Sequence, residues 1–78
     1  MPYSSDELIR AVEGQGFVMK GGHGRRGSHR VWARPGAPGE RHRTVTIPIG
    51  KKEIPAGTLS SIKHQLGIDE DELRRWMT

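Results

Sequence analysis

The chain has 78 residues, no cysteine, and an excess of basic over acidic residues that gives a formal net charge of +4. Without cysteine, disulfide bonds and zinc sites built on thiolates are excluded. No apolar run approaches the roughly 20 residues that a membrane-spanning helix requires, and the first residues do not resemble a signal peptide. We therefore expect a single cytoplasmic domain over residues 1–78, near the lower size limit for a self-sufficient core.

The positive charge is concentrated in the middle of the chain. Residues 20–52 contain nine Lys and Arg residues against one acid, Glu40, whereas residues 67–78 contain four acids and two arginines. A basic segment of this density indicates a polyanionic partner, most simply a nucleic acid. The alternative is that these charges form a solvated surface that keeps a small protein in solution.

The first predicted element is a helix over residues 5–14. Ser4 and Glu7 have the spacing of a capping box, in which each side chain bonds to the backbone of the other residue. Tyr3 and Leu8 flank the same helix start as the two residues of a hydrophobic staple do. The glycines that follow the apolar stripe supply the end of the helix.

Three strands are predicted next, over residues 17–20, 28–34 and 43–48. The last two alternate between apolar and polar residues, as a strand with one buried face does. Pro35 ends the middle strand, because proline cannot donate a backbone hydrogen bond to a ladder. A connection rich in proline and glycine then leads to the third strand.

The middle strand raises the question of which face is buried. Alternation places two sets of side chains on opposite faces: His29, Val31 and Ala33 on one, and Arg30, Trp32 and Arg34 on the other. Because the second set is the more polar, we expect the first to face the core, with His29 near the rim of the sheet. Trp32 would then be free to stack on a base or to fill a protein interface; the alternative is burial beneath the terminal helix with Trp76.

Two helices are predicted after the strands. Leu59, Ile62 and Leu66 form the apolar stripe of a helix over residues 57–66, and Gly67 stands where a left-handed residue ends such a helix. A short terminal helix follows from Asp69, with acids in its first turn and arginines near its end. The order α-β-β-β-α with a further terminal helix predicts an α+β fold, in which a three-stranded antiparallel sheet carries the helices on one face.

Two patterns in the basic segment have little support. Residues 22–27, GHGRRG, match the letters of the dinucleotide-binding G-x-G-x-x-G and contain the GXXG of KH domains. Either fold requires a helix to follow, whereas a strand pattern follows here. The histidines at positions 23, 29 and 42 lack the spacing of metal ligands on a helix. The sequence therefore predicts no metal and no cofactor.

Two features of the basic segment suit RNA chemistry. Lys51 and Lys52 precede the start of the second predicted helix, whose free N–H groups and dipole attract anions, so they form a candidate phosphate site; the alternative is two solvated side chains. His29 can accept and donate a proton near neutral pH, although a lone histidine is more often structural. Because RNA carries its own nucleophile, the 2′-hydroxyl, one base beside cationic phosphate ligands can cleave RNA without a metal.

Four stretches of the chain together resemble the HicA-type mRNA interferases, the toxin half of bacterial toxin–antitoxin pairs. They are SSDELIRAVEGQGF, GSHRVW, TVTIPIGKKEIPAGTLSSIKHQLGI and the acidic DEDEL. The resemblance implies a double-stranded-RNA-binding-like fold, an endoribonuclease that acts on free or ribosome-linked mRNA, and a HicB antitoxin as partner. It also implies that His29 corresponds to the catalytic histidine and that Gly27 and Ser28 complete its motif.

The sequence thus predicts a metal-independent endoribonuclease that inhibits translation, with His29 as the general base. The predicted substrate-binding residues are Gly27, Ser28, Arg30, Lys51 and Lys52. Two other classes stay open: a non-catalytic RNA-binding module of the double-stranded-RNA-binding type, and a protein whose basic face only docks an acidic partner. The long basic loop before GSH and the long connection after the middle strand leave open which RNA is preferred and whether His23 or His42 contributes.

Overall fold

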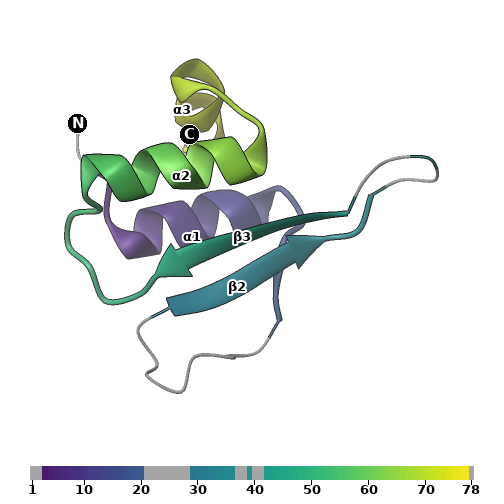
Figure 1. The fold of residues 1–78 in the computed structure, drawn as a ribbon, viewed down its shortest axis with the longest axis horizontal. Coiled ribbons are helices and arrows are strands. Elements are labelled where there is room, and N and C mark those ends of the chain that lie inside the picture. Colours follow the sequence, from purple (N-terminus) through teal and green to yellow (C-terminus); the bar gives the residue numbers. More distant parts are fainter. Residues whose placement is uncertain (1–2, 21–28, 37–38, 40–41, 78) are drawn as a thin grey trace.

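A computed structural model describes residues 3–20, 29–36, 39 and 42–77. The element order is α1 (Ser5–Gly14), β1 (Val18–Met19), β2 (His29–Arg34), β3 (Arg43–Pro48), α2 (Ala56–Leu66) and α3 (Glu70–Trp76). The strands form one antiparallel sheet in the order β1-β2-β3. Figure 1 shows the helices covering one face of this sheet; α1 and α2 both contact β3, and α3 contacts α1. The predicted α+β fold is confirmed.

The helix ends are where the local sequence signals put them. The Glu7 N–H donates to the Ser4 hydroxyl (3.2 Å) and the Ser4 N–H donates to the Glu7 carboxylate (2.8 Å), which completes the predicted capping box. Gly67 ends α2 in the left-handed conformation, with φ of +71°, and its N–H donates back to the last turn of the helix. The Ile68 N–H donates to the Lys63 carbonyl (3.1 Å), the second bond of this type of helix ending.

The predicted orientation of the middle strand was wrong. The register pairs Trp32 with Val45 and Arg30 with Ile47, and cross-strand partners share a face of the sheet. Since Trp32, Val45 and Ile47 are each 2% exposed or less, the face with Arg30, Trp32 and Arg34 is the one that meets the core. His29, Val31 and Ala33 therefore lie on the face of the sheet away from the helices.

The reversal follows from the shape of the side chains. Trp32 brings a large apolar area to the core, and its indole N–H is satisfied by the Glu13 carboxylate of α1 at 3.0 Å. Arg34 extends across the core edge, with its guanidinium 5.0 Å from the centre of the Phe17 ring and donating to the Gln15 carbonyl (3.2 Å). An arginine can thus cover apolar groups with its stem while its charged head stays hydrated. Polarity alone was a poor guide to the buried face.

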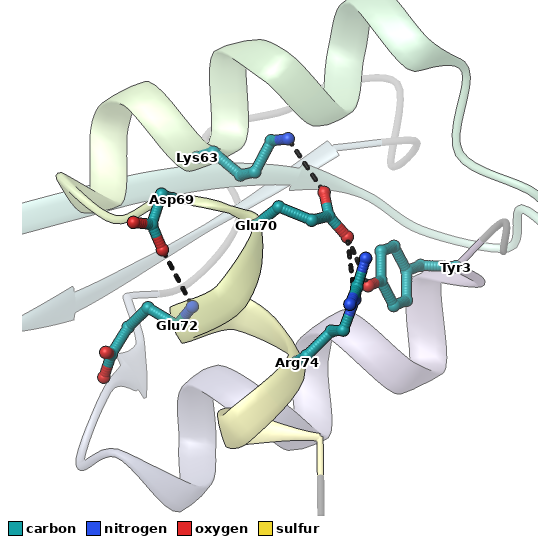
Figure 2. Close-up of polar contacts among 6 residues, drawn as sticks. All are labelled: Tyr3, Lys63, Asp69, Glu70, Glu72 and Arg74. Atoms are coloured by element: carbon teal, nitrogen blue, oxygen red, sulfur yellow. Dashed lines mark hydrogen bonds and ion pairs between the residues drawn. The ribbon is translucent and has the colours of Figure 1, made fainter.

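A polar cluster around Glu70 ties α3 to the rest of the molecule (Figure 2). The Glu70 carboxylate accepts hydrogen bonds from the Tyr3 hydroxyl (2.7 Å) and from Lys63 of α2 (2.9 Å), and Arg74 lies 3.9 Å from it. The bonds from Tyr3 and Lys63 lower the pKa of Glu70, and the same bond to Glu70 raises the pKa of Tyr3. Leu73 of the same helix is fully buried in the core.

Candidate functional site

The candidate site lies at the end of the sheet where β2 begins and β3 ends. His29 is the first residue of β2, it is exposed, and the register pairs it with Pro48, the last residue of β3. Figure 1 shows that α1 and α2 also begin at this end of the molecule. The elements therefore bring the start of β2 close to the segment that connects β3 with α2.

That connecting segment carries Lys51 and Lys52, both exposed. Gly50 turns the chain there with φ of +77°, a conformation that side chains with a Cβ rarely adopt. The backbone of the segment is bonded to the start of α1: the Ser5 N–H donates to the Lys51 carbonyl (2.9 Å) and the Ile54 N–H donates to the Tyr3 carbonyl (2.7 Å). Lys51 and Lys52 therefore lie on a turn whose backbone is hydrogen-bonded to the start of α1. This turn follows β3, whose last residue pairs with His29.

Arg30 is adjacent to His29 along β2, but its side chain leaves the opposite face of the sheet. The Arg30 side chain is half-buried, and its guanidinium donates to the His29 carbonyl oxygen at 3.3 Å. The guanidinium is therefore held at the same end of β2 as His29. His29 and Arg30 are thus neighbours along the strand, and their side chains lie on opposite faces of the sheet.

The other histidines and the predicted motif residues fall elsewhere. Gly27, Ser28 and His23 lie outside the described residues. His42 precedes β3, whose first residue pairs with the last residue of β2, so it stands at the far end of the β2–β3 ladder from His29. His42 is one residue beyond the end of this ladder of six pairs, so the two histidines lie about 20 Å apart along the strands. Trp32, considered above as a base-stacking residue, is buried in the core and cannot stack on RNA.

The sequence model of the family described as HicA toxin of bacterial toxin-antitoxin matches residues 5–68. The chain belongs to the HicA toxin family. It is accordingly the toxin of a bacterial toxin–antitoxin pair, and an antitoxin is its partner. A comparison with curated proteins gives no match.

The match divides this HicA toxin into two parts. It covers α1, the sheet and α2, and with them His29, Lys51 and Lys52. It ends before α3, so the acidic run at 69–72 and the polar cluster around Glu70 lie partly or wholly beyond it. The candidate site therefore belongs to the matched part, whereas Glu70 and the rest of α3 lie beyond the match.

Elsewhere, the described residues of this HicA toxin form no candidate metal site. Within residues 3–20, 29–36, 39 and 42–77, no three His, Asp or Glu side chains gather closely enough to hold a metal ion. In that same part of the chain no helix is long and apolar enough to cross a membrane. A shallow hollow on α2 is lined by Gly57, Ser60, Ser61, His64 and Gln65. Another lies between α1 and α3.

Proposed function

We propose that this HicA toxin is a metal-independent endoribonuclease that cleaves mRNA and thereby inhibits translation. His29 is the general base. It removes the proton of an RNA 2′-hydroxyl, whose oxygen then attacks the adjacent phosphorus. The bond from phosphorus to the 5′-oxygen of the next nucleotide breaks, and that oxygen takes a proton from solvent water. The observation that carries this proposal is an exposed histidine at the open end of the sheet, on the strand paired with the one that leads into Lys51 and Lys52.

Lys51 and Lys52 are the phosphate ligands in this proposal. Both side chains are exposed, and no ion pair joins either of them to a carboxylate in the described part of the chain. Their charge is therefore available to the phosphate as it becomes more negative in the transition state. Arg30, held at the same strand end, and Gly27 and Ser28, which the family motif supplies, complete the proposed binding set.

The antitoxin partner is proposed to be of the HicB type. A ribonuclease that cuts mRNA harms its own cell unless it is inhibited, and the simplest inhibition covers His29. The surface of the antitoxin should be acidic where it meets residues 20–52, because that segment carries a formal charge of +8. Co-expression of the toxin with the adjacent reading frame should give a complex and restore growth; separate elution of the two proteins with persistent toxicity would exclude the pairing.

The products of cleavage test the reaction itself. Labelled mRNA incubated with the toxin in excess chelator should yield fragments that end in 2′,3′-cyclic phosphate and begin with a 5′-hydroxyl. RNA with a single 2′-deoxynucleotide at the cleaved position should survive, since the nucleophile is missing. Binding of both RNAs without cleavage of either would establish the non-catalytic RNA-binding module instead, and activity that the chelator removes would refute the metal-independent mechanism.

A further inference from the structure

One buried hydroxyl is hydrogen-bonded both to the end of β3 and to the turn that carries Lys51 and Lys52. The Ser5 Oγ donates a hydrogen bond to the Pro48 carbonyl oxygen (2.6 Å) and accepts one from the Lys51 N–H (3.0 Å). Together with the bond from the Ser5 N–H to the Lys51 carbonyl, this gives the first residue of α1 three bonds to the segment between β3 and α2. Two of those bonds involve Lys51 itself.

The burial of Ser5 shows that this contact is enclosed. Ser5 is 1% exposed and is the single buried polar residue in the described part of the chain. A buried hydroxyl is costly unless it is hydrogen-bonded, and here it both donates and accepts. Water cannot readily replace it, so its removal would leave the Pro48 carbonyl and the Lys51 N–H without a partner in the interior.

The position of these two atoms links Ser5 to the candidate site. Pro48 is the cross-strand partner of His29, and Lys51 is the first of the two lysines proposed to hold phosphate. One oxygen atom therefore connects the backbone opposite the base with the backbone that carries the phosphate ligands. The start of α1 sets where the lysines stand relative to His29.

From this geometry we infer that Ser5 is a positioning residue for RNA cleavage, which acts by holding Lys51 and Lys52 in register with His29. The inference rests on the proposed ribonuclease function. Ser5 does not touch the substrate and acts only through the turn. Because small misplacements of binding groups weaken transition-state contacts, its loss should lower kcat/KM even where the fold persists.

The test compares Ser5→Ala with Ser4→Ala. Ser4 is the neighbouring residue on the same helix end, and its hydroxyl caps α1 without any bond to the turn, so Ser4→Ala is a matched control for weakening the helix. Measured at a temperature where both variants are folded, Ser5→Ala should lower kcat/KM for RNA cleavage about tenfold. Ser4→Ala should leave it within about twofold of the wild type. An equal loss in the two variants would overturn the inference.

A second comparison separates positioning from general damage. In a background of Lys51→Ala with Lys52→Ala, which keeps the Lys51 N–H, Ser5→Ala should lower kcat/KM by less than about twofold, because the groups it positions are absent. An undiminished tenfold loss in that background would show that Ser5 does not act through the lysines. If Ser5→Ala does not fold, Ser5→Cys, with nearly the same volume and weaker hydrogen bonding, should give an intermediate loss. Wild-type kcat/KM in a folded Ser5→Cys variant would also refute the inference.

Failure of the proposed ribonuclease function can be distinguished from failure of the Ser5 inference. If the wild type binds RNA but does not cleave it, the ribonuclease proposal fails, and the same variants are compared by their RNA affinity. Loss of affinity in Ser5→Ala that disappears in the lysine-free background would still support Ser5 as a positioning residue for RNA binding. A wild type that cleaves RNA, with Ser5→Ala matching Ser4→Ala, would overturn the Ser5 inference alone.

Discussion

Polar side chains gather at two places in this HicA toxin, and the two places use them differently. Around Glu70, donors and acceptors satisfy one another: Tyr3 and Lys63 both donate to one carboxylate (Figure 2). At the His29 end, Lys51 and Lys52 are exposed, and the described residues offer neither of them a carboxylate partner. The first arrangement fastens α3 to the molecule, whereas the second leaves positive charge available to an anion.

Among the described residues, the pKa shifts of Tyr3, Glu70 and Glu72 arise at α3 and away from the proposed site. The pKa values of Glu70 and Tyr3 move because they bond to each other, and that of Glu72 is lowered by its bonds from Arg75 and Trp76. All of these groups belong to the α3 region. Perturbed groups often mark active sites, but structural ion-pair networks perturb them as well. The proposed site depends instead on the exposed Lys51 and Lys52, which form no ion pair with any described carboxylate.

Removal of the proposed base at His29 has the largest expected effect. His29→Ala should lower the rate of RNA cleavage by about 10²–10⁴, as loss of a general base does, and should end growth arrest. Since His29 is exposed, the free energy of unfolding should change by less than about 1 kcal/mol. His42→Ala, at the far end of the same ladder, is the control and should cleave RNA as the wild type does. Wild-type cleavage by His29→Ala would remove this residue from the mechanism.

A substitution in α3 should lower stability without affecting cleavage. Leu73 is fully buried, so Leu73→Ala should lower the free energy of unfolding by about 2–5 kcal/mol through lost burial and the cavity that remains. Denaturant unfolding at low temperature measures this loss. Under conditions where the variant is still folded, its cleavage rate should equal that of the wild type. A large fall in rate without a fall in stability would mean that α3 takes part in the chemistry.

The contribution of positive charge to RNA binding can be compared between the turn after β3 and helix α3. Lys51→Ala with Lys52→Ala and Arg74→Ala with Arg75→Ala each remove two positive charges. The lysine pair should weaken RNA binding and make the plot of log affinity against log salt less steep by about 1.4, the value for two phosphate contacts on a single strand. The arginine pair should leave that slope unchanged. Equal slopes for the two double variants would indicate that only net charge matters and that the turn is no phosphate site.

Much of the fold could be predicted because its signals are local. The capping box of Ser4 and Glu7 and the left-handed Gly67 depend on residues a few positions apart, and both are present. The buried face of β2 could not be read in the same way, because Trp32 and Arg34 are each partly apolar and partly polar. Their orientation depends on contacts with Glu13 of α1 and with Phe17, which precedes β1.

The candidate site was predicted only in part, for a related reason. His29, Lys51 and Lys52 stood out by residue type and by family motif, and the register brings the end of β3 to His29. Ser5 carried no signal of its own, since its partner Lys51 is 46 positions away and a hydroxyl in a first helical turn is ordinary. Only the folded chain reveals that contact.

The smallest expected effect is the change with pH in the stability that Glu70 contributes. The hydrogen bonds from Tyr3 and Lys63 hold the pKa of Glu70 below that of an ordinary glutamate, so its carboxylate is favoured in the folded state. A lowered carboxyl pKa stabilises the fold above the unfolded-state value, about 4.3, and this contribution is lost as the pH falls through the lower folded-state value. Glu70→Gln should therefore be less stable than the wild type at pH 7, and the difference should shrink on acidification below about pH 4. Thermal unfolding of both proteins from pH 7 to pH 3 measures it, with RNA cleavage at pH 7 as the control. A stability difference that does not change with pH would mean that the carboxylate charge of Glu70 contributes nothing to holding α3.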